Sequence, residues 1–550
     1  MNLKDLADLM FPDVKESVSD IEKKYPERNL PNEAEVTRFA PSPTGFVHMG
    51  SLLSAFEDFK AAKDTNGVFY LRIEDTDQER SVENGIEGII KDLADFDIVP
   101  DEGVVSETEQ KGEYGPYIQS ERKYIYHVYA KDLVERGLAY PCFCTKEDLD
   151  ETREIQELNK ERIGYYGSYA KCRSLSVSEA IEKIKNGEKY VVRFKSPGDF
   201  NKRITLNDRM RGKIEFPEND MDIVIIKSTD GLPTYHFAHV VDDHLMKTTT
   251  VMRGEEWIPS YPIHHQLFET MGFKEPMYAH LGLVMKIDEN GTRRKLSKRK
   301  DPEASVSFYH EKGIPSEATK LYLMTIANSN FEEWFLNNPT GKLSDFKMDF
   351  NKMSESGTLF DVEKLFNITK NYISRMTSEE LYNEALPWMM EYDKELYDLM
   401  VKYKDYTIAI FSIERYQEKP RKDYSSFSDI RNGIWYMYDE LFTNLEYEYQ
   451  KITDKDEILN ILNTYFTKYY DINDDKETWF NKVKMMCDEL GYASNMKDYK
   501  KNPEGYKGNV ADISTVIRVS MTTRSQAPDL YEILKLLGMD KINKRIDLLK

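Results

Sequence analysis

The sequence predicts an α/β protein: an α/β domain split by an α+β insertion and followed by a mostly α-helical region. Three observations predict this fold class. Residues 36–40 and 68–73 are apolar strand candidates on either side of an amphipathic helical pattern, which makes a βαβ unit. A second set of strand and helix signals occupies residues 224–287. Strand signals fade after Lys300, where helical patterns take over.

The length of 550 residues calls for several domains rather than one core. The changes in pattern along the chain set the expected boundaries. They are 1–33 for an N-terminal extension, 34–125 for the first α/β half, 126–220 for the insertion, 221–300 for the second half, 301–375 for a connecting region and 376–550 for the helical region.

Composition excludes two classes of protein. No apolar run approaches the length of a membrane span, so we expect no membrane partner. The net charge of −21 argues against an indiscriminate nucleic-acid binder. The acidic start lacks the features of a signal or transit peptide, and the four cysteines form no disulfide framework. We therefore expect a cytoplasmic location.

The segment RFAPSPTGFVHMGS, residues 38–51, breaks a strand with prolines and glycines and then opens a helix. A helix N-terminus at the carboxyl edge of a parallel sheet attracts anions. Gly45 and Gly50 permit close backbone approach, and His48 is placed to donate to a phosphate oxygen. The segment predicts a nucleotide site, with a tight turn carrying a surface histidine as the structural alternative.

The basic segment RRKLSKRK, residues 293–300, follows the hairpin signal DENG. A basic loop on a rigid sheet can close over a triphosphate and stabilise the charge that develops during transfer. Lys295, Ser297 and Lys298 are its candidate residues, and a solvated lysine run is the alternative. We expect this loop and His48 to act on the same nucleotide.

The pair HMGS and KLSKR resembles the two signature sequences of class I aminoacyl-tRNA synthetases. Together with LRIEDTD, DGLPTYHFAHVVDDHLM, RGEEW and VIRVSMTTRSQAPDLYEILKLLG, they resemble the glutamyl-tRNA synthetase family of bacterial type. The resemblance implies a Rossmann-type catalytic domain, an acceptor-stem-binding insertion at 126–220, a stem-contact region at 301–375 and an anticodon-binding region at 376–550. It also implies ATP, Mg²⁺, L-glutamate and tRNA(Glu) as ligands, and a monomer is expected.

The resemblance also assigns site residues. The positions that match the family's ATP site are His48, Gly50, Ser51, Lys295, Ser297 and Lys298, of which His48, Lys295 and Lys298 are the catalytic ones. The positions that match its glutamate site are Arg38, Ala40, Ser42, Glu74, Tyr235, His239 and Arg253. Two guanidinium groups and a carboxylate suit an amino acid with two carboxylates and one ammonium. We expect Arg38 on the side-chain carboxylate, Arg253 on the α-carboxylate and Glu74 on the ammonium.

Three of the cysteines lie close together in the insertion. Cys142, Cys144 and Cys172, with Tyr169 as the fourth ligand, resemble a zinc site that some family members carry. The tyrosine spacing departs from the family pattern, and three reduced thiols are the alternative.

Two other functions remain open at this point. One is a non-discriminating enzyme that also glutamylates tRNA(Gln), or a glutaminyl-tRNA synthetase. The other is a small-molecule nucleotidyltransferase that uses the same ATP site, although such an enzyme has no need of a long helical region. The family resemblance favours glutamate activation and transfer to tRNA(Glu).

Overall fold

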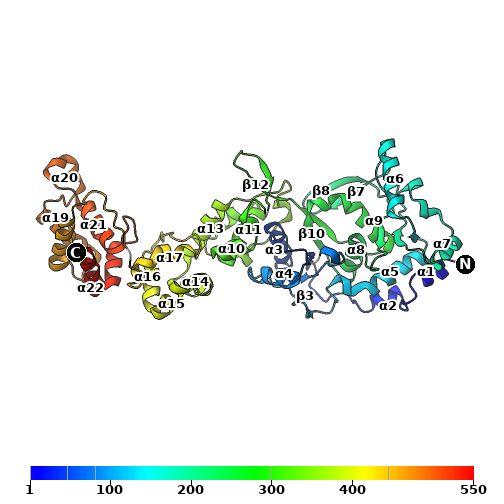
Figure 1. Ribbon diagram of the computed structural model, residues 1–550, viewed down its shortest axis with the longest axis horizontal. Helices are drawn as coiled ribbons and strands as arrows, with labels where there is room; N and C mark the ends of the chain where they lie inside the picture. Colours follow the sequence, from blue (N-terminus) through cyan, green and yellow to red (C-terminus); the bar gives the residue numbers. More distant parts are fainter. Residues whose placement is uncertain (1, 46, 81, 298, 444) are drawn as a thin grey trace. The chain divides into compact units, whose positions relative to one another are not determined.

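The computed structural model describes every residue except 1, 46, 81, 298 and 444, and the chain divides into two compact units (Figure 1). Unit 1 comprises Met1–Phe308 and Lys320–Asp361, and unit 2 comprises Tyr309–Thr319 and Val362–Lys550. Unit 1 is mixed α/β, and the named elements of unit 2 are all helices among its described residues. This agrees with the predicted fold class.

The strands all lie in unit 1. They are β1 (Val36–Phe39), β2 (Val68–Leu71), β3 (Glu102–Val104), β4 (Gln110–Lys111), β5 (Ala139–Cys142), β6 (Val191–Phe194), β7 (Arg203–Asp208), β8 (Gly212–Pro217), β9 (Val224–Ile226), β10 (Thr250–Gly254), β11 (Met277–Leu281), β12 (Val284–Ile287), β13 (Arg293–Lys295) and β14 (Thr358–Leu359).

Two parallel groups of strands form the centre of unit 1. Strands β1, β2 and β3 pair in parallel, and so do β10 and β11. Hydrogen bonds between Val36 and Thr249 join β1 to the residue that precedes β10. The insertion therefore separates two halves in sequence that are neighbours in space, as the sequence predicts.

Helices cover these strands. In chain order the α-helices that precede the basic loop are α1 (Leu3–Met10), α2 (Val18–Glu22), α3 (Met49–Asp64), α4 (Gly85–Ala94), α5 (Lys123–Glu135), α6 (Lys146–Asn159), α7 (Val177–Lys185), α8 (Tyr235–Leu245) and α9 (Tyr261–Met271). Helix α3 packs on β1, β2 and β10, and α1 of the N-terminal segment packs on α5 (Figure 1). No helix among the described residues has the length and apolar character that a membrane crossing requires.

Two strands differ from the expectation. Residues 280–287, HLGLVMKI, read as one strand candidate at the end of the second set of signals, but they belong to two strands, β11 and β12, in different sheets. The chain breaks at Gly282, where a Cβ atom would lie 2.3 Å from the backbone nitrogen of Gly357. Strand β9, expected with the second half, pairs instead with β6 of the inserted segment. The DENG hairpin is confirmed, since β12 and β13 pair antiparallel across that turn.

The remaining helices follow the basic loop. They are α10 (Ser307–Lys312), α11 (Ser316–Ala327), α12 (Phe331–Asn337), α13 (Val362–Arg375), α14 (Ser378–Tyr392), α15 (Lys394–Lys402), α16 (Lys404–Ser412), α17 (Asp429–Ile434), α18 (Lys455–Thr464), α19 (Lys476–Leu490), α20 (Met496–Lys501), α21 (Val510–Thr522) and α22 (Leu530–Leu549). One continuous hydrophobic core runs through unit 2. Cys487 lies fully buried in this core, as its helical context predicts.

Candidate active site

A cavity of about 560 Å³ opens in unit 1 where β1 passes into α3. It is lined by the predicted ATP residues His48, Gly50, Ser51 and Lys295. Residues from β10, β11 and the β11–β12 break close its other side. The two signature segments, about 250 positions apart in the sequence, thus meet at one cavity.

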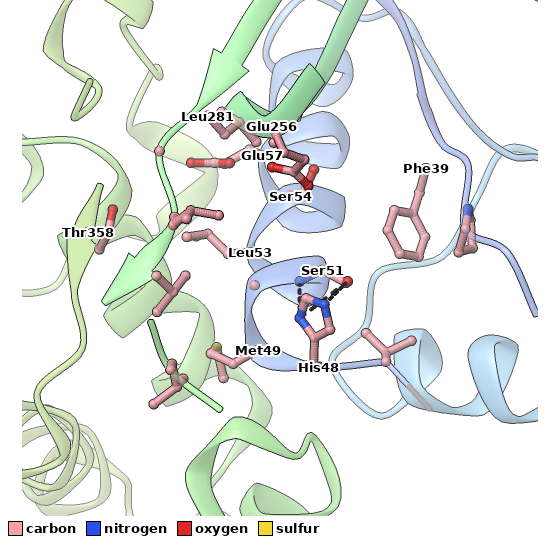
Figure 2. A pocket seen from close by; sticks show the side chains of 18 of the residues that line it. Phe39, His48, Met49, Ser51, Leu53, Ser54, Glu57, Glu256, Leu281 and Thr358 are labelled. Atoms are coloured by element: carbon pink, nitrogen blue, oxygen red, sulfur yellow. Dashed lines mark hydrogen bonds between the residues drawn. The ribbon is translucent and has the colours of Figure 1, made fainter. Parts of the chain in front are cut away.

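His48 is the N-cap residue of α3 (Figure 2). Its Nδ1 accepts a hydrogen bond of 3.0 Å from the backbone N–H of Ser51, which places the ring proton on Nε2. Nε2 lies 3.1 Å from the Ser51 hydroxyl. The capping bond orients the imidazole at the helix N-terminus, where the helix dipole favours a negative ligand.

The basic loop is anchored at its base. Arg294 forms two hydrogen bonds, of 2.6 and 2.7 Å, with the carboxylate of Asp301. That carboxylate also accepts from the backbone N–H of Ser297 at 2.9 Å. Lys295 projects to the cavity, but Ser297 is not among its lining residues. The predicted catalytic residue Lys298 lies outside the described residues.

Two carboxyl groups that the sequence analysis did not single out also line the cavity. Figure 2 shows Glu57 and Glu256 at the end of the cavity away from His48. Glu57 is only 3% exposed, and its Oε2 has no hydrogen-bond partner among the described residues. Burial raises the pKa of Glu57 to about 8. At neutral pH this side chain is therefore mostly a neutral acid.

Arg38 enters a buried cluster of charges beside this cavity. It is 4% exposed, its Nε lies 3.5 Å from Asp243, and its Nη1 donates to the backbone oxygen of Met252. Burial alone would lower the pKa of Arg38, but Asp243 raises it above the ordinary value. Arg72 donates to the same Asp243 at 2.6 Å. Asp243, absent from the predicted set, is the shared counter-ion of both arginines.

Arg253 is held from two sides. Its Nε donates to His280 Nε2 and its Nη1 donates to His264 Nδ1, and both hydrogen bonds are 3.0 Å long. Its Nη2 is buried and has no hydrogen-bond partner among the described residues. The Arg253 guanidinium also lies 4.5 Å from the centre of the Tyr278 ring. A fixed guanidinium with one unmatched donor suits an incoming carboxylate.

Tyr235 and Glu74 complete the cluster. Burial raises the pKa of the Tyr235 hydroxyl, and the charges that act on it are those of Arg253, Glu74 and Arg38. Glu74 accepts a hydrogen bond of 2.9 Å from Arg72. The charged groups that act on Tyr235 are thus among the predicted glutamate residues. Ala40 and Ser42 of the same set line the nucleotide cavity next door.

His239, also predicted in the glutamate site, lies between two protein groups. Its Nδ1 lies 2.7 Å from Asp243 and its Nε2 is 2.8 Å from the Tyr278 hydroxyl. Burial lowers its pKa to about 3, so the ring is neutral. Because both ring nitrogens face protein groups, His239 supports the cluster rather than presenting a group to a ligand.

The three cysteines of the inserted segment gather as predicted. The sulfur atoms of Cys142, Cys144 and Cys172 all lie within 4.8 Å of one another. A hydrogen bond from Cys172 lowers the pKa of Cys142, against the effect of burial. A pre-formed group of three sulfurs fits a tetrahedral cation.

Tyr169, the predicted fourth ligand, is placed away from the three sulfurs. Its hydroxyl is hydrogen-bonded to Glu161, outside the cluster. Tyr165 occupies the expected place, with its hydroxyl 3.3 Å from both Cys142 Sγ and Cys144 Sγ. The spacing rule fails because the chain winds through short 3₁₀ turns between Tyr165 and Cys172, which alters how many residues separate two neighbouring side chains.

Comparisons with known proteins agree with this geometry. Residues 35–367 match the family model for the catalytic domain of class I tRNA synthetases (E and Q). The chain is 47% identical to the glutamate–tRNA ligase of Clostridium perfringens (strain 13 / Type A), over 99% of this chain and all of that one. It is 48% identical to that of Acetivibrio thermocellus, over 99% of both chains. A crystal structure of a glutamate tRNA ligase from Elizabethkingia meningosepticum, in complex with its amino acid, superimposes with a TM-score of 0.75 at 28% identity, covering 94% of this chain and all of that chain.

The split parallel sheet, the histidine-capped helix and the lysine loop around one cavity define a class I aminoacyl-tRNA synthetase of the glutamate and glutamine group. Within this group, the chain belongs to the glutamate–tRNA ligase family.

Proposed function

We propose specific residue roles for glutamate–tRNA ligation, the activity that this chain has as a member of its family. In the first step an α-carboxylate oxygen of glutamate attacks the α-phosphorus of ATP, the bond to the bridging oxygen breaks, and pyrophosphate leaves. In the second step a ribose hydroxyl at the 3′ end of tRNA attacks the carbonyl carbon of glutamyl-adenylate, and AMP leaves. No protein nucleophile is needed, so the residues act by positioning and by charge stabilisation.

In this proposal, Arg38 binds the side-chain carboxylate, Arg253 binds the α-carboxylate, and Glu74 binds the ammonium. One observation carries the assignment: both arginines are almost completely buried, and Arg253 Nη2 has no hydrogen-bond partner among the described residues, whereas Arg38 Nε faces Asp243 at 3.5 Å. A buried unmatched donor is costly unless a ligand completes it. Tyr235 adds a hydroxyl where the charges of all three residues act.

ATP occupies the neighbouring cavity in this proposal, with its phosphates at His48 and the start of α3. The Nε2 proton of His48 and the ammonium of Lys295 stabilise the charge that develops on the phosphate oxygens. We assign Lys298 the same role from its sequence position alone. Mg²⁺ would neutralise the triphosphate when bound. Mg²⁺ is commonly held by substrate phosphates together with one or two carboxylates.

We also propose that Cys142, Cys144, Cys172 and Tyr165 hold Zn²⁺. Three sulfurs within 4.8 Å of one another and a phenol hydroxyl supply a tetrahedral donor set. Such a site would fix β5 against the turn that carries Cys172. The expected domain boundaries, monomeric state and cytoplasmic location stay predictions.

Charging assays with purified tRNA(Glu) and tRNA(Gln) test the choice of substrate. We expect glutamate to be attached to tRNA(Glu) and glutamine to be rejected, because an amide cannot provide the charge that a buried guanidinium requires. Attachment of glutamate to both tRNAs would identify a non-discriminating enzyme. Charging with glutamine would refute the assignment of Arg38.

A further inference from the structure

Arg253 lies in the middle of a chain of hydrogen bonds that no part of the proposed mechanism uses. The chain runs from Asp208 to His280, to Arg253, to His264 and finally to His236. Its members come from β7, β11, β10, α9 and α8, so the hydrogen bonds link five separate elements, with Arg253 in the middle.

The direction of each hydrogen bond follows from elementary chemistry. Hydrogen bonds from His280 and from backbone amides lower the pKa of Asp208, although burial opposes them, so it is an acceptor. His280 must therefore donate from Nδ1, which leaves the lone pair of Nε2 to accept from Arg253. An arginine has no acceptor, so His264 Nδ1 also accepts from Arg253.

The far end of the chain is fixed in the same way. With Nδ1 of His264 accepting, its proton lies on Nε2 and is donated to His236 Nδ1 over 2.9 Å. Burial, reinforced by the positive charge of Arg253, holds the pKa of His264 well below its ordinary value. Both imidazoles that touch Arg253 are therefore neutral acceptors.

We propose that His264 and His280 are positioning residues that set the affinity for the α-carboxylate of glutamate. They occupy Nη1 and Nε of Arg253 and so fix the guanidinium plane, which leaves Nη2 as the donor with no partner among the described residues. This inference rests on the proposed role of Arg253.

Paired amide substitutions test the proposal, because an asparagine oxygen replaces Nδ1 of histidine and a glutamine oxygen replaces Nε2. At position 264 the acceptor for Arg253 is Nδ1, so His264→Asn keeps it and His264→Gln loses it. At position 280 the acceptor is Nε2, so His280→Gln keeps it and His280→Asn loses it. The proposal therefore expects asparagine to be tolerated better than glutamine at position 264, and glutamine better than asparagine at position 280.

Steady-state charging supplies the measurement. We expect the KM for glutamate to rise about tenfold or more in His264→Gln and His280→Asn, but less than about threefold in His264→Asn and His280→Gln. The KM for ATP stays within about twofold in all four variants. His265→Asn is the matched control, because the neighbouring His265 pairs with Glu275 instead of Arg253.

A merely structural role predicts the same order of amides at both positions, set by side-chain size, and that result would overturn the proposal. So would four variants with an unchanged KM for glutamate. If one position does not tolerate substitution in a thermal melt, the pair at the other position decides alone. Arg253→Gln tests the role of Arg253 separately from that of the two histidines: an unchanged KM for glutamate in that variant would contradict the proposed function itself.

Discussion

The amino-acid cluster and the nucleotide cavity are neighbours, but they are built differently. Around Arg38 and Arg253 the charges are buried and held by fixed partners from several strands and helices. At the cavity, Lys295 is exposed at the end of β13, where β13 pairs with β12 and the Arg294–Asp301 ion pair holds the start of the basic segment. If the proposed roles hold, the difference means that the glutamate site is pre-formed, while the exposed Lys295 side chain becomes ordered when ATP binds.

The largest loss of activity is expected when a guanidinium of the buried cluster is removed. Arg38→Ala should lower kcat/KM for glutamate by about 10³-fold or more, because a buried charged contact is worth several kcal/mol. The fold should survive, since Arg72 still neutralises Asp243. Charging kinetics with a thermal melt check this prediction. Near-normal charging by a folded variant would contradict it.

The loop gives the complementary prediction. Lys295→Ala should lower kcat by about 10²-fold and leave the KM for glutamate nearly unchanged, because the lysine acts on the charge of the transition state. Lys300→Ala is the control, since Lys300 belongs to the same basic segment but does not line the cavity. Equal losses in the two variants would show that only the general charge of the loop matters.

The cysteine cluster is also pre-formed, and its proposed fourth zinc ligand can be tested. Tyr165→Phe should weaken zinc retention about 10–100-fold, while Tyr169→Phe should have no effect. Metal content after exposure to a competing chelator measures this. Equal retention in both variants would remove Tyr165 from the ligand set.

The last prediction concerns the pH dependence of stability and Glu57. Its pKa of about 8 in the folded protein exceeds that of the unfolded chain, so the folded state binds the extra proton between roughly pH 4.5 and pH 8. Stability should fall by about 1.4 kcal/mol per pH unit across that window from this group alone. Glu57→Gln should remove this slope, as unfolding measured at pH 5.5, 7 and 8.5 would reveal. An unchanged slope would mean that Glu57 is ionised at neutral pH.

Local patterns predicted the parts of the site that depend on local structure. The position of His48 at the start of a helix and the hairpin before the basic loop both follow from a few adjacent residues. Asp243, His264 and His280 were not predicted, because their contacts with the arginines join residues far apart in the sequence. A histidine followed by another, as at 264 and 265, carries no signal of which one faces the site.

Tyr165 was missed for a related reason. Counting residues back from Cys172 assumes one backbone conformation, and the 3₁₀ turns in this segment follow another. The break between β11 and β12 was missed because apolar residues continue across Gly282, although the close approach of Gly357 requires the glycine. Composition and periodicity thus predicted the fold class, but not the points where the chain changes sheet.

A crystal structure with L-glutamate and a non-hydrolysable ATP analogue tests whether the two arginines bind the two carboxylates of glutamate beside the triphosphate. This assignment places the side-chain carboxylate at about 3 Å from Arg38 and the α-carboxylate at about 3 Å from Arg253 Nη2. It also places the triphosphate against His48 and Lys295. Glutamate bound away from either arginine, or with both carboxylates in the nucleotide cavity, would contradict it.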